Sequence, residues 1–327
     1  MNKHELARQY REKYGWDIPT AKLARIMYQD NKLLFKDSEH ARLILRYIEG
    51  KTGKKMPKNI AHKVENRPLN PYNLPKSHKT DYTPFIMSKH NKVGIINDLH
   101  IPYHDNEAIT LALSFFKAEN IDALILNGDI LDFHSLSSFE KDPNHRKFSE
   151  ELDAFSDFME VIKNELECKI YYKLGNHEER YNRFLFQKAH ELKGINEFEI
   201  ESLLRSRVSY PIEIIKDKRI IKLNGLNIIH GHEYKGGIST PVNIARGLYL
   251  KGKVSACQGH NHATSEHTEA DMNGKIVTTW SIGCLCGLNP EYMPLNKWNH
   301  GFAIVDLDPN GKDYHFRNYR ITDGKIV

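Results

Sequence analysis

From residue 93 onward, short apolar segments alternate with segments whose apolar residues have helical spacing. The apolar runs that predict strands lie at 93–96, 123–126 and 170–174. Between them, the segments at 107–117 and 152–166 predict amphipathic helices. Such alternation is typical of βαβ units, in which a crossover helix joins two parallel strands. We therefore predict an α/β fold with a mostly parallel sheet.

Strands dominate the part of the sequence after residue 212. The apolar runs that predict them lie at 212–215, 220–223, 226–229 and 254–258, and one helix is expected at 241–251. Asn224 and Gly225, which separate two of these runs, are typical of a two-residue hairpin turn. We therefore expect the α/β core to contain two sheets.

Five of the predicted strands are followed directly by an unusually polar cluster. In chain order the clusters are Asn97-Asp98-Leu99-His100, Asn127-Gly128-Asp129-Ile130-Leu131-Asp132, Gly175-Asn176-His177-Glu178, His230-Gly231-His232 and Gly259-His260-Asn261-His262. In α/β sheets, ligand-binding groups converge at the carboxyl ends of the strands. Carboxylate, imidazole and amide oxygen together are ligands for divalent metals such as Mn²⁺, Fe²⁺ or Zn²⁺. One such cluster is more often a loop hydrogen bond than a site, but five in order predict a metal centre.

This series of motifs resembles the calcineurin-like metallophosphoesterase superfamily. The matching motifs are Asp98-Leu99-His100, Gly128-Asp129-x-x-Asp132, Gly175-Asn176-His177-Glu178, His230 and Gly259-His260-Asn261-His262, and the resemblance covers residues 92–327. The residues within and next to these motifs also resemble those of phosphoesterases encoded by phages and mobile elements. The resemblance implies a four-layer αββα sandwich of two mixed sheets.

The same resemblance implies a phosphoesterase with two divalent cations. The implied ligands are Asp98, His100 and His262 for one ion and Asn176, His230 and His260 for the other, with Asp129 bridging both. Mn²⁺ is the ion that we expect first, with Fe²⁺, Zn²⁺ and Ni²⁺ as alternatives. Two ions about 3.5–4 Å apart need an anion between them, and a water held there can lose a proton near neutral pH and attack phosphorus.

Other residues of the motifs have expected roles around this centre. His177 would face the substrate and protonate the leaving oxygen or stabilise its developing charge, and Asp132 would orient His177. Glu178 is either a support behind the ligands or a charge at a helix N-terminus. The candidate substrate contacts are Arg180, His134 and His232, although a solvent-facing or supporting role is the alternative for each.

Five further residues are open to two interpretations. Cys284 and Cys286 alternate as in a buried strand, so core thiols are favoured over metal ligands. Tyr292 and Trp298, together with Trp280, either line the substrate cleft or pack in the core.

The substrate is expected to be a nucleic-acid or nucleotide phosphodiester. Serine/threonine phosphatases of the superfamily typically carry Arg at the places where this sequence has Phe133 and Leu174, which is evidence against that activity. A phosphomonoesterase or protein phosphatase is nevertheless kept as an alternative. A second alternative is a catalytically idle scaffold that binds nucleic acid.

The N-terminal part of the chain differs in charge from the rest. Residues 1–90 hold 19 Lys and Arg against 9 Asp and Glu, whereas the whole chain holds 47 against 42. We predict a basic helical unit at 1–50, possibly helix-turn-helix-like, a Pro- and Lys-rich linker at 51–91 and a catalytic domain at 92–327. The basic segment can bind nucleic acid by neutralising phosphates, or it can be no more than a solvated face.

No apolar stretch approaches the roughly 20 residues that span a bilayer. The charged N-terminus lacks the apolar core of a secretory signal, and four cysteines are too few for a disulfide scaffold. We therefore expect no membrane partner and a reducing, cytoplasmic location. The sequence leaves the oligomeric state open.

Overall fold

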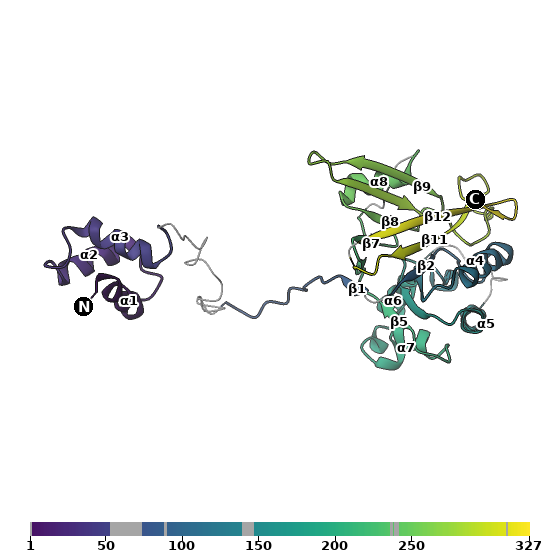
Figure 1. Ribbon diagram of the computed structural model, residues 1–327. Coiled ribbons are helices and arrows are strands. Elements are labelled where there is room, and N and C mark those ends of the chain that lie inside the picture. Colours follow the sequence, from purple (N-terminus) through teal and green to yellow (C-terminus); the bar gives the residue numbers. More distant parts are fainter. Residues whose placement is uncertain are drawn as a thin grey trace. The chain divides into compact units, whose positions relative to one another are not determined.

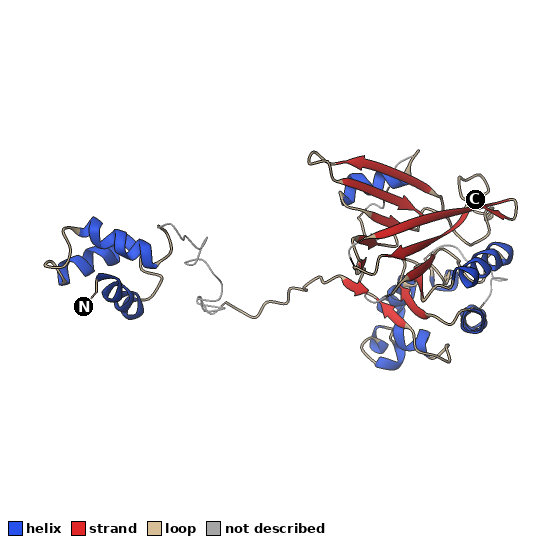
Figure 2. Cartoon of the chain, in the orientation of Figure 1, coloured by secondary structure: helices blue, strands red, loops and turns tan. Residues whose placement is uncertain are grey.

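The computed structural model describes residues 2–52, 74–87, 90–138, 147–235, 238, 242–311 and 313–327. The chain divides into two compact units, Met1–Thr80 and Asp81–Val327, which are described separately below. Figure 1 shows the elements of each unit in chain order, and Figure 2 separates their helices from their strands.

Among its described residues the first unit has three helices, all within the segment 1–50 that is predicted to be helical. They are α1 (Lys3–Tyr14), α2 (Thr20–Asp30) and α3 (Ser38–Ile48). The side chains of Asn2 and Asp37 accept hydrogen bonds from the first turns of α1 and α3, and Gly15 ends α1 with a φ of 75°. Buried apolar residues of all three helices form one core, which includes Leu6, Leu23, Met27 and Leu45.

The segment predicted as a linker is only partly described. Residues 53–73 of the 51–91 segment lie outside the described residues. Within the remainder, Phe85–Met87 forms strand β1, which pairs in parallel with β6 (Ile221–Leu223). Arg219 also donates hydrogen bonds to the carbonyl oxygens of Thr83 and Pro84. The second unit therefore begins before residue 92, and three residues are too few for their apolar pattern to predict a strand among prolines.

A seven-stranded mixed sheet forms the first half of the second unit. Its strands, in spatial order, are β13 (Lys325–Ile326), β12 (Tyr314–Thr322), β11 (His300–Leu307), β2 (Lys92–Ile96), β3 (Ala123–Asn127), β4 (Lys169–Lys173) and β5 (Glu213–Ile215). Strands β2 to β5 are parallel, and β11 to β13 add antiparallel pairs at one side. The predicted βαβ alternation is thus confirmed for β2, β3 and β4.

A six-stranded mixed sheet forms the second half. Its spatial order is β1, β6, β7 (Leu226–Ile228), β8 (Ala256–Gln258), β10 (Ile276–Ser281) and β9 (Ser265–Ala270). The predicted turn at Asn224-Gly225 joins β6 and β7, which pair antiparallel. Strands β7 and β8 are parallel, so both end at the same edge of the sheet.

The two sheets pack face to face, with helices on their outer sides. The helices of this unit are α4 (Asn106–Glu119), α5 (Phe148–Glu165), α6 (Glu179–Lys188), α7 (Ile200–Arg205) and α8 (Ile244–Gly252). Val93 and Ile95 of β2 belong to the core between the sheets, whereas Ile96 packs in the core beneath the helices, as the period of two in a strand requires. Leu248 of α8 packs on the other sheet. The predicted fold class, two mixed sheets between helical layers, is confirmed.

Among the described residues, every helix is too short or too polar to cross a lipid bilayer.

Candidate metal centre

The polar clusters that follow the strands lie together in the structure. Asp98 and His100 follow β2, Asp129 and Asp132 follow β3, and Asn176 and His177 follow β4. His230 follows β7, and His260 and His262 follow β8. Parallel strands deliver their carboxyl ends to one edge, so side chains that are far apart in the sequence converge there.

The backbone at this edge is strained. The left-handed region is occupied by Asp98, His100, Asp129, His260 and His262, with φ between 50° and 65°. This conformation is uncommon for residues other than glycine, and it persists only where surrounding contacts enforce it. Such strain is concentrated at functional sites, and here it directs five site residues.

One group of ligand atoms is centred on Asp98. The Oδ1 atom of Asp98 lies 3.2 Å from Nε2 of His262 and 3.9 Å from Nε2 of His100. The two imidazole Nε2 atoms are themselves 3.2 Å apart. The other carboxylate oxygen, Oδ2, accepts hydrogen bonds from the Asn97 side chain and the His260 backbone N–H. Oδ1 is therefore the atom of Asp98 that remains available to a cation.

A second group is centred on Asp129. Its Oδ2 atom lies 3.2 Å from Nε2 of His230, and ligand atoms of Asp129, His230 and His260 lie within 4.8 Å of one another. Nε2 of His230 is also 3.9 Å from Oδ1 of Asp98, so the two groups are adjacent. Asp129 also lies in a group with His100 and His177, so it has neighbours in both the first and the second group.

Three buried atoms of these groups have no hydrogen-bond partner. They are Oδ1 of Asp98, Oδ1 of Asn176 and Nε2 of His230. Buried polar atoms in native proteins are nearly always satisfied, so an unpaired cluster of lone-pair donors calls for an explanation. Divalent cations supply one, since carboxylate, amide oxygen and imidazole are the ligands that such ions take. The residues present thus fit a pair of divalent cations.

The charges of the two groups are strongly interdependent. Burial alone would raise the pKa of Asp129, but the charges of His230 and His177 hold it well below its usual range. Burial and the nearby charge of His230 lower the pKa of His260 to about 4. His260 is therefore neutral at pH 7 and keeps a lone pair for a cation.

Asp132 connects His177 to a candidate ligand. Its Oδ1 atom lies 3.0 Å from Nδ1 of His177 and also 3.0 Å from Nδ1 of His100. Arg180 donates to the Asp132 carbonyl oxygen and contacts Nε2 of His177 at 3.0 Å. Burial alone would lower the pKa of His177, yet the charges of Asp129 and Asp132 raise it. The orienting position expected for Asp132 is thus present, and it extends to His100.

Glu178 supports the backbone that carries Asp129. Its buried carboxylate accepts hydrogen bonds from the backbone N–H groups of Asp129, Ile130, Leu131 and Gly175 and from the Tyr172 hydroxyl. Of the two interpretations left open for this residue, the structure favours the supporting one. The Gly175 position is equally constrained, because a Cβ there would collide with the Asp129 carboxylate.

Lys173 and Glu233 form a similar support that we did not predict. Nζ of Lys173, which is fully buried at the end of β4, lies 2.9 Å from the Glu233 carboxylate. Glu233 in turn accepts hydrogen bonds from the backbone N–H groups of His230 and Gly231. The sequence feature that could have indicated this pair is Lys173 within the apolar run 170–174, because a buried lysine needs a charged or polar partner.

The three predicted substrate contacts occupy different surroundings. Arg180 belongs to the Asp132–His177 pair described above. The Nε2 atom of His232 lies 3.1 Å from the Glu179 carboxylate, and its ring is 5.3 Å from that of His230. His134 begins a short 3₁₀ helix, His134–Leu136, directly after the Asp132 loop.

Cys257, Cys284, Cys286 and Trp280 are buried, whereas Cys168 is half-buried. All four cysteines are free. Sγ of Cys286 lies 3.9 Å from Nδ1 of His262, and Cys286 forms a potential metal-binding group with His100 and His262. The thiol contacts Nδ1 of His262, but Nε2 is the ring nitrogen that faces Asp98. The thiol and Asp98 therefore lie on different sides of the ring, which favours a packing role for the thiol. Trp280 stacks on Phe316 in the core between the sheets, so it does not line a cleft.

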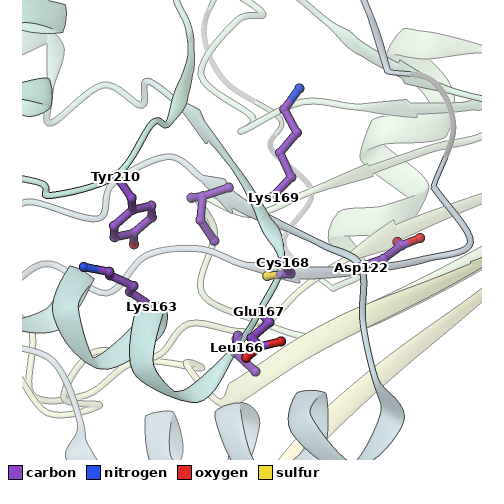
Figure 3. A pocket seen from close by; sticks show the side chains of 8 residues that line it. Asp122, Lys163, Leu166, Glu167, Cys168, Lys169 and Tyr210 are labelled. Atoms are coloured by element: carbon purple, nitrogen blue, oxygen red, sulfur yellow. The ribbon is translucent and has the colours of Figure 1, made fainter.

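A cavity of about 360 Å³ lies at the opposite edge of the sheet (Figure 3). Asp122, which precedes β3, and Lys169, the first residue of β4, line it together with Cys168. Burial raises the pKa of the Cys168 thiol to about 12, which makes it a poor nucleophile. This cavity is therefore separate from the metal centre and contributes nothing to it.

Comparison with known proteins gives a family match and several distant similarities. The family model described as calcineurin-like phosphoesterase matches residues 91–273, more than half of the chain. The Gene 54 protein of Mycobacterium phage D29 is 22% identical over 239 residues, which cover 68% of this chain and 91% of the phage protein. Among solved structures, vacuolar protein sorting 29 from Cryptosporidium parvum is 15% identical over 73% of this chain and 95% of its own, with a TM-score of 0.40. A dimetal phosphatase from Danio rerio is 13% identical over 70% of this chain and 96% of its own, with a TM-score of 0.34.

We predict that Glu178→Gln destabilises the protein. A glutamine side chain presents an N–H₂ group to backbone donors that the carboxylate now satisfies, so at least one buried N–H loses its partner. The expected loss in the free energy of urea unfolding is about 2–3 kcal/mol. The matched control, Glu197→Gln at an exposed position, should change it by less than about 0.5 kcal/mol. Equal effects of the two substitutions would contradict the supporting role.

Proposed function

Because this chain belongs to the calcineurin-like phosphoesterase family, we propose that it is a hydrolase that cleaves a phosphoester with the help of two divalent cations. The observation that carries the proposal is the set of unpartnered, buried ligand atoms on Asp98, Asn176 and His230. These atoms belong to residues that follow three different strands, and cations of charge +2 are partners that suit such atoms. Mn²⁺ is the first ion to test.

The proposed ligands combine the two groups described above with Asn176, which the resemblance of the motifs implies. Asp98, His100 and His262 would hold one cation, Asn176, His230 and His260 would hold the other, and Asp129 would serve both. The chemistry that the two cations supply is charge neutralisation at the phosphoryl oxygens and activation of a water nucleophile. The carboxylate of Asp129 offsets the repulsion between them.

His177 is proposed to act on the leaving group. Because Asp132 holds the ring at Nδ1, Nε2 is the ring nitrogen that is free to turn its proton toward a leaving group. In the structure Nε2 accepts a hydrogen bond from Arg180 at 3.0 Å, since a guanidinium only donates, so Arg180 must move from Nε2 before this atom carries a proton. The charges of Asp129 and Asp132 raise the pKa of His177 and favour that protonation. Once it has moved, Arg180 adds positive charge where the leaving oxygen becomes negative.

We predict that the full chain with Mn²⁺ hydrolyses bis-p-nitrophenyl phosphate and that Asp129→Ala abolishes this turnover. His177→Ala should lower kcat by roughly 10²–10⁴-fold for diphenyl phosphate. Its effect on the p-nitrophenyl diester should be smaller, because p-nitrophenolate leaves without a proton. The control is His190→Ala, an exposed histidine whose side chain is 75% accessible.

The outcome also separates the alternatives. A wild-type chain as inert as Asp129→Ala with every divalent metal tested would contradict the enzyme proposal and favour an idle scaffold. Turnover of monoesters without diesters would favour a phosphomonoesterase. An equal loss for both leaving groups in His177→Ala would show that His177 is not the proton donor.

A nucleic-acid or nucleotide phosphodiester is the substrate class that we propose. Phe133 and Leu174 stand where a serine/threonine phosphatase would present arginines. Both are buried, and Phe133 packs against Phe148 and Tyr181, so neither can contact a substrate phosphate. This is evidence against phosphoprotein recognition of that kind. The free thiols are compatible with the reducing cytoplasm that we propose as the location.

The basic N-terminal part is proposed to bind the nucleic acid. Residues 2–52 hold 11 Lys and Arg against 7 Asp and Glu, and residues 53–90 hold 8 against 2. The positive excess is therefore larger after the three-helix unit than within it. Within the unit, Lys22, Arg25, Lys32 and Lys36 are exposed cations of α2 and the segment that follows it.

We predict that the full chain binds duplex DNA with an affinity that falls steeply as salt rises. Replacing Lys22, Arg25, Lys32 and Lys36 by Gln should weaken binding and flatten the dependence of log K on log salt, because fewer counterions are released. The control replaces four exposed lysines of the second unit: Lys169, Lys188, Lys275 and Lys325. Equal slopes for the two variants, measured by fluorescence anisotropy, would contradict the proposed interface.

A further inference from the structure

The loop between β10 and β11 carries exposed apolar side chains beside the metal centre. Tyr292 is 77% exposed and Leu295 is 94% exposed. Single exposed apolar side chains are common, but several on one surface segment are typical of a binding site. Because both side chains belong to one loop, this loop is a candidate binding surface.

Ring contacts connect this loop to a proposed ligand. The ring of Trp298 lies 4.1 Å from the ring of His262, measured between centroids, with the planes at 64°. The ring of Tyr292 lies 6.5 Å from that of Trp298. Tyr292 therefore stands next to the centre.

The loop is held in shape by side-chain hydrogen bonds. Asn296 donates to the carbonyl oxygens of Leu288 and Met293, at 2.7 and 2.9 Å, and accepts from the backbone N–H of Trp298. Asn299 then ties the end of the loop to the loop of His262, because its backbone N–H donates to the His262 carbonyl oxygen at 2.9 Å. An exposed ring on a braced loop loses little conformational entropy when a ligand stacks on it.

Resting on the proposed function, we propose that Tyr292 is a stacking platform for a nucleobase of the substrate. A phosphoester bound at the cations places its organic group beside them, and Tyr292 is an exposed ring on that side, connected to His262 through the ring of Trp298. Every nucleobase offers a planar π face, so stacking suits a substrate of mixed sequence. Trp298, wedged between Tyr292 and His262, fixes how far the base lies from the phosphate.

The test uses binding rather than turnover. Isothermal titration of the Mn²⁺-loaded full chain compares ethylphosphonate with the phosphonate analogue of thymidine 5′-monophosphate, in which CH₂ replaces the ester oxygen. Neither probe can be hydrolysed at its C–P bond. Wild type and Tyr292→Phe should bind the thymidine probe about tenfold more tightly than ethylphosphonate. Tyr292→Leu should lose most of this preference while its Kd for ethylphosphonate stays unchanged.

Three results would overturn the proposal: equal Kd values for the two probes in the wild type, a preference that survives in Tyr292→Leu, or no binding of either probe. Benzylphosphonate is the third probe, and if it binds as tightly as the thymidine probe, Tyr292 recognises any aromatic ring and not a nucleobase. Failure of the proposed function is detected by a different measurement. If the chain is not a phosphoesterase, bis-p-nitrophenyl phosphate is not hydrolysed, irrespective of the Kd values of the phosphonate probes.

Discussion

The candidate site of the second unit depends on a set of buried polar atoms that have no hydrogen-bond partner. Polar side chains that follow five strands gather there, and Oδ1 of Asp98, Oδ1 of Asn176 and Nε2 of His230 are buried without a hydrogen-bond partner. Unpaired buried polar atoms cost free energy, and divalent cations bound among them would remove that cost. Other buried residues of the site make contacts that hold these side chains in their orientations.

Two buried carboxylates provide those contacts. Glu178 holds the turn that carries Asp129, and Glu233 holds the turn that carries His230 while Lys173 balances its charge. Both act on backbone N–H groups, and Glu178 thereby holds Asp129 in a left-handed conformation that residues other than glycine usually avoid. On the proposed function, the candidate ligands are oriented before a cation binds, which lowers the entropic cost of binding.

The sequence predicted two sheets and placed the polar clusters after the strands, because both follow from strand periodicity and from parallel strands ending at one edge. It did not predict the support by Lys173 and Glu233, since a pairing across 60 positions leaves no local pattern. Strand β1 was missed because its three residues lie among prolines, and their pairing with β6 is a tertiary contact. The role of Glu178 stayed open for the same reason: only the folded turn shows which N–H groups its carboxylate meets.

The central claim is that two cations occupy the volume between Asp98, Asp129 and His230. The most direct measurement is metal content after saturation with Mn²⁺ and removal of free ion, combined with anomalous diffraction to locate the ions. The account predicts two manganese ions per chain, one on each side of the Asp129 carboxylate. A saturated protein with no ion or only one at this position would contradict it.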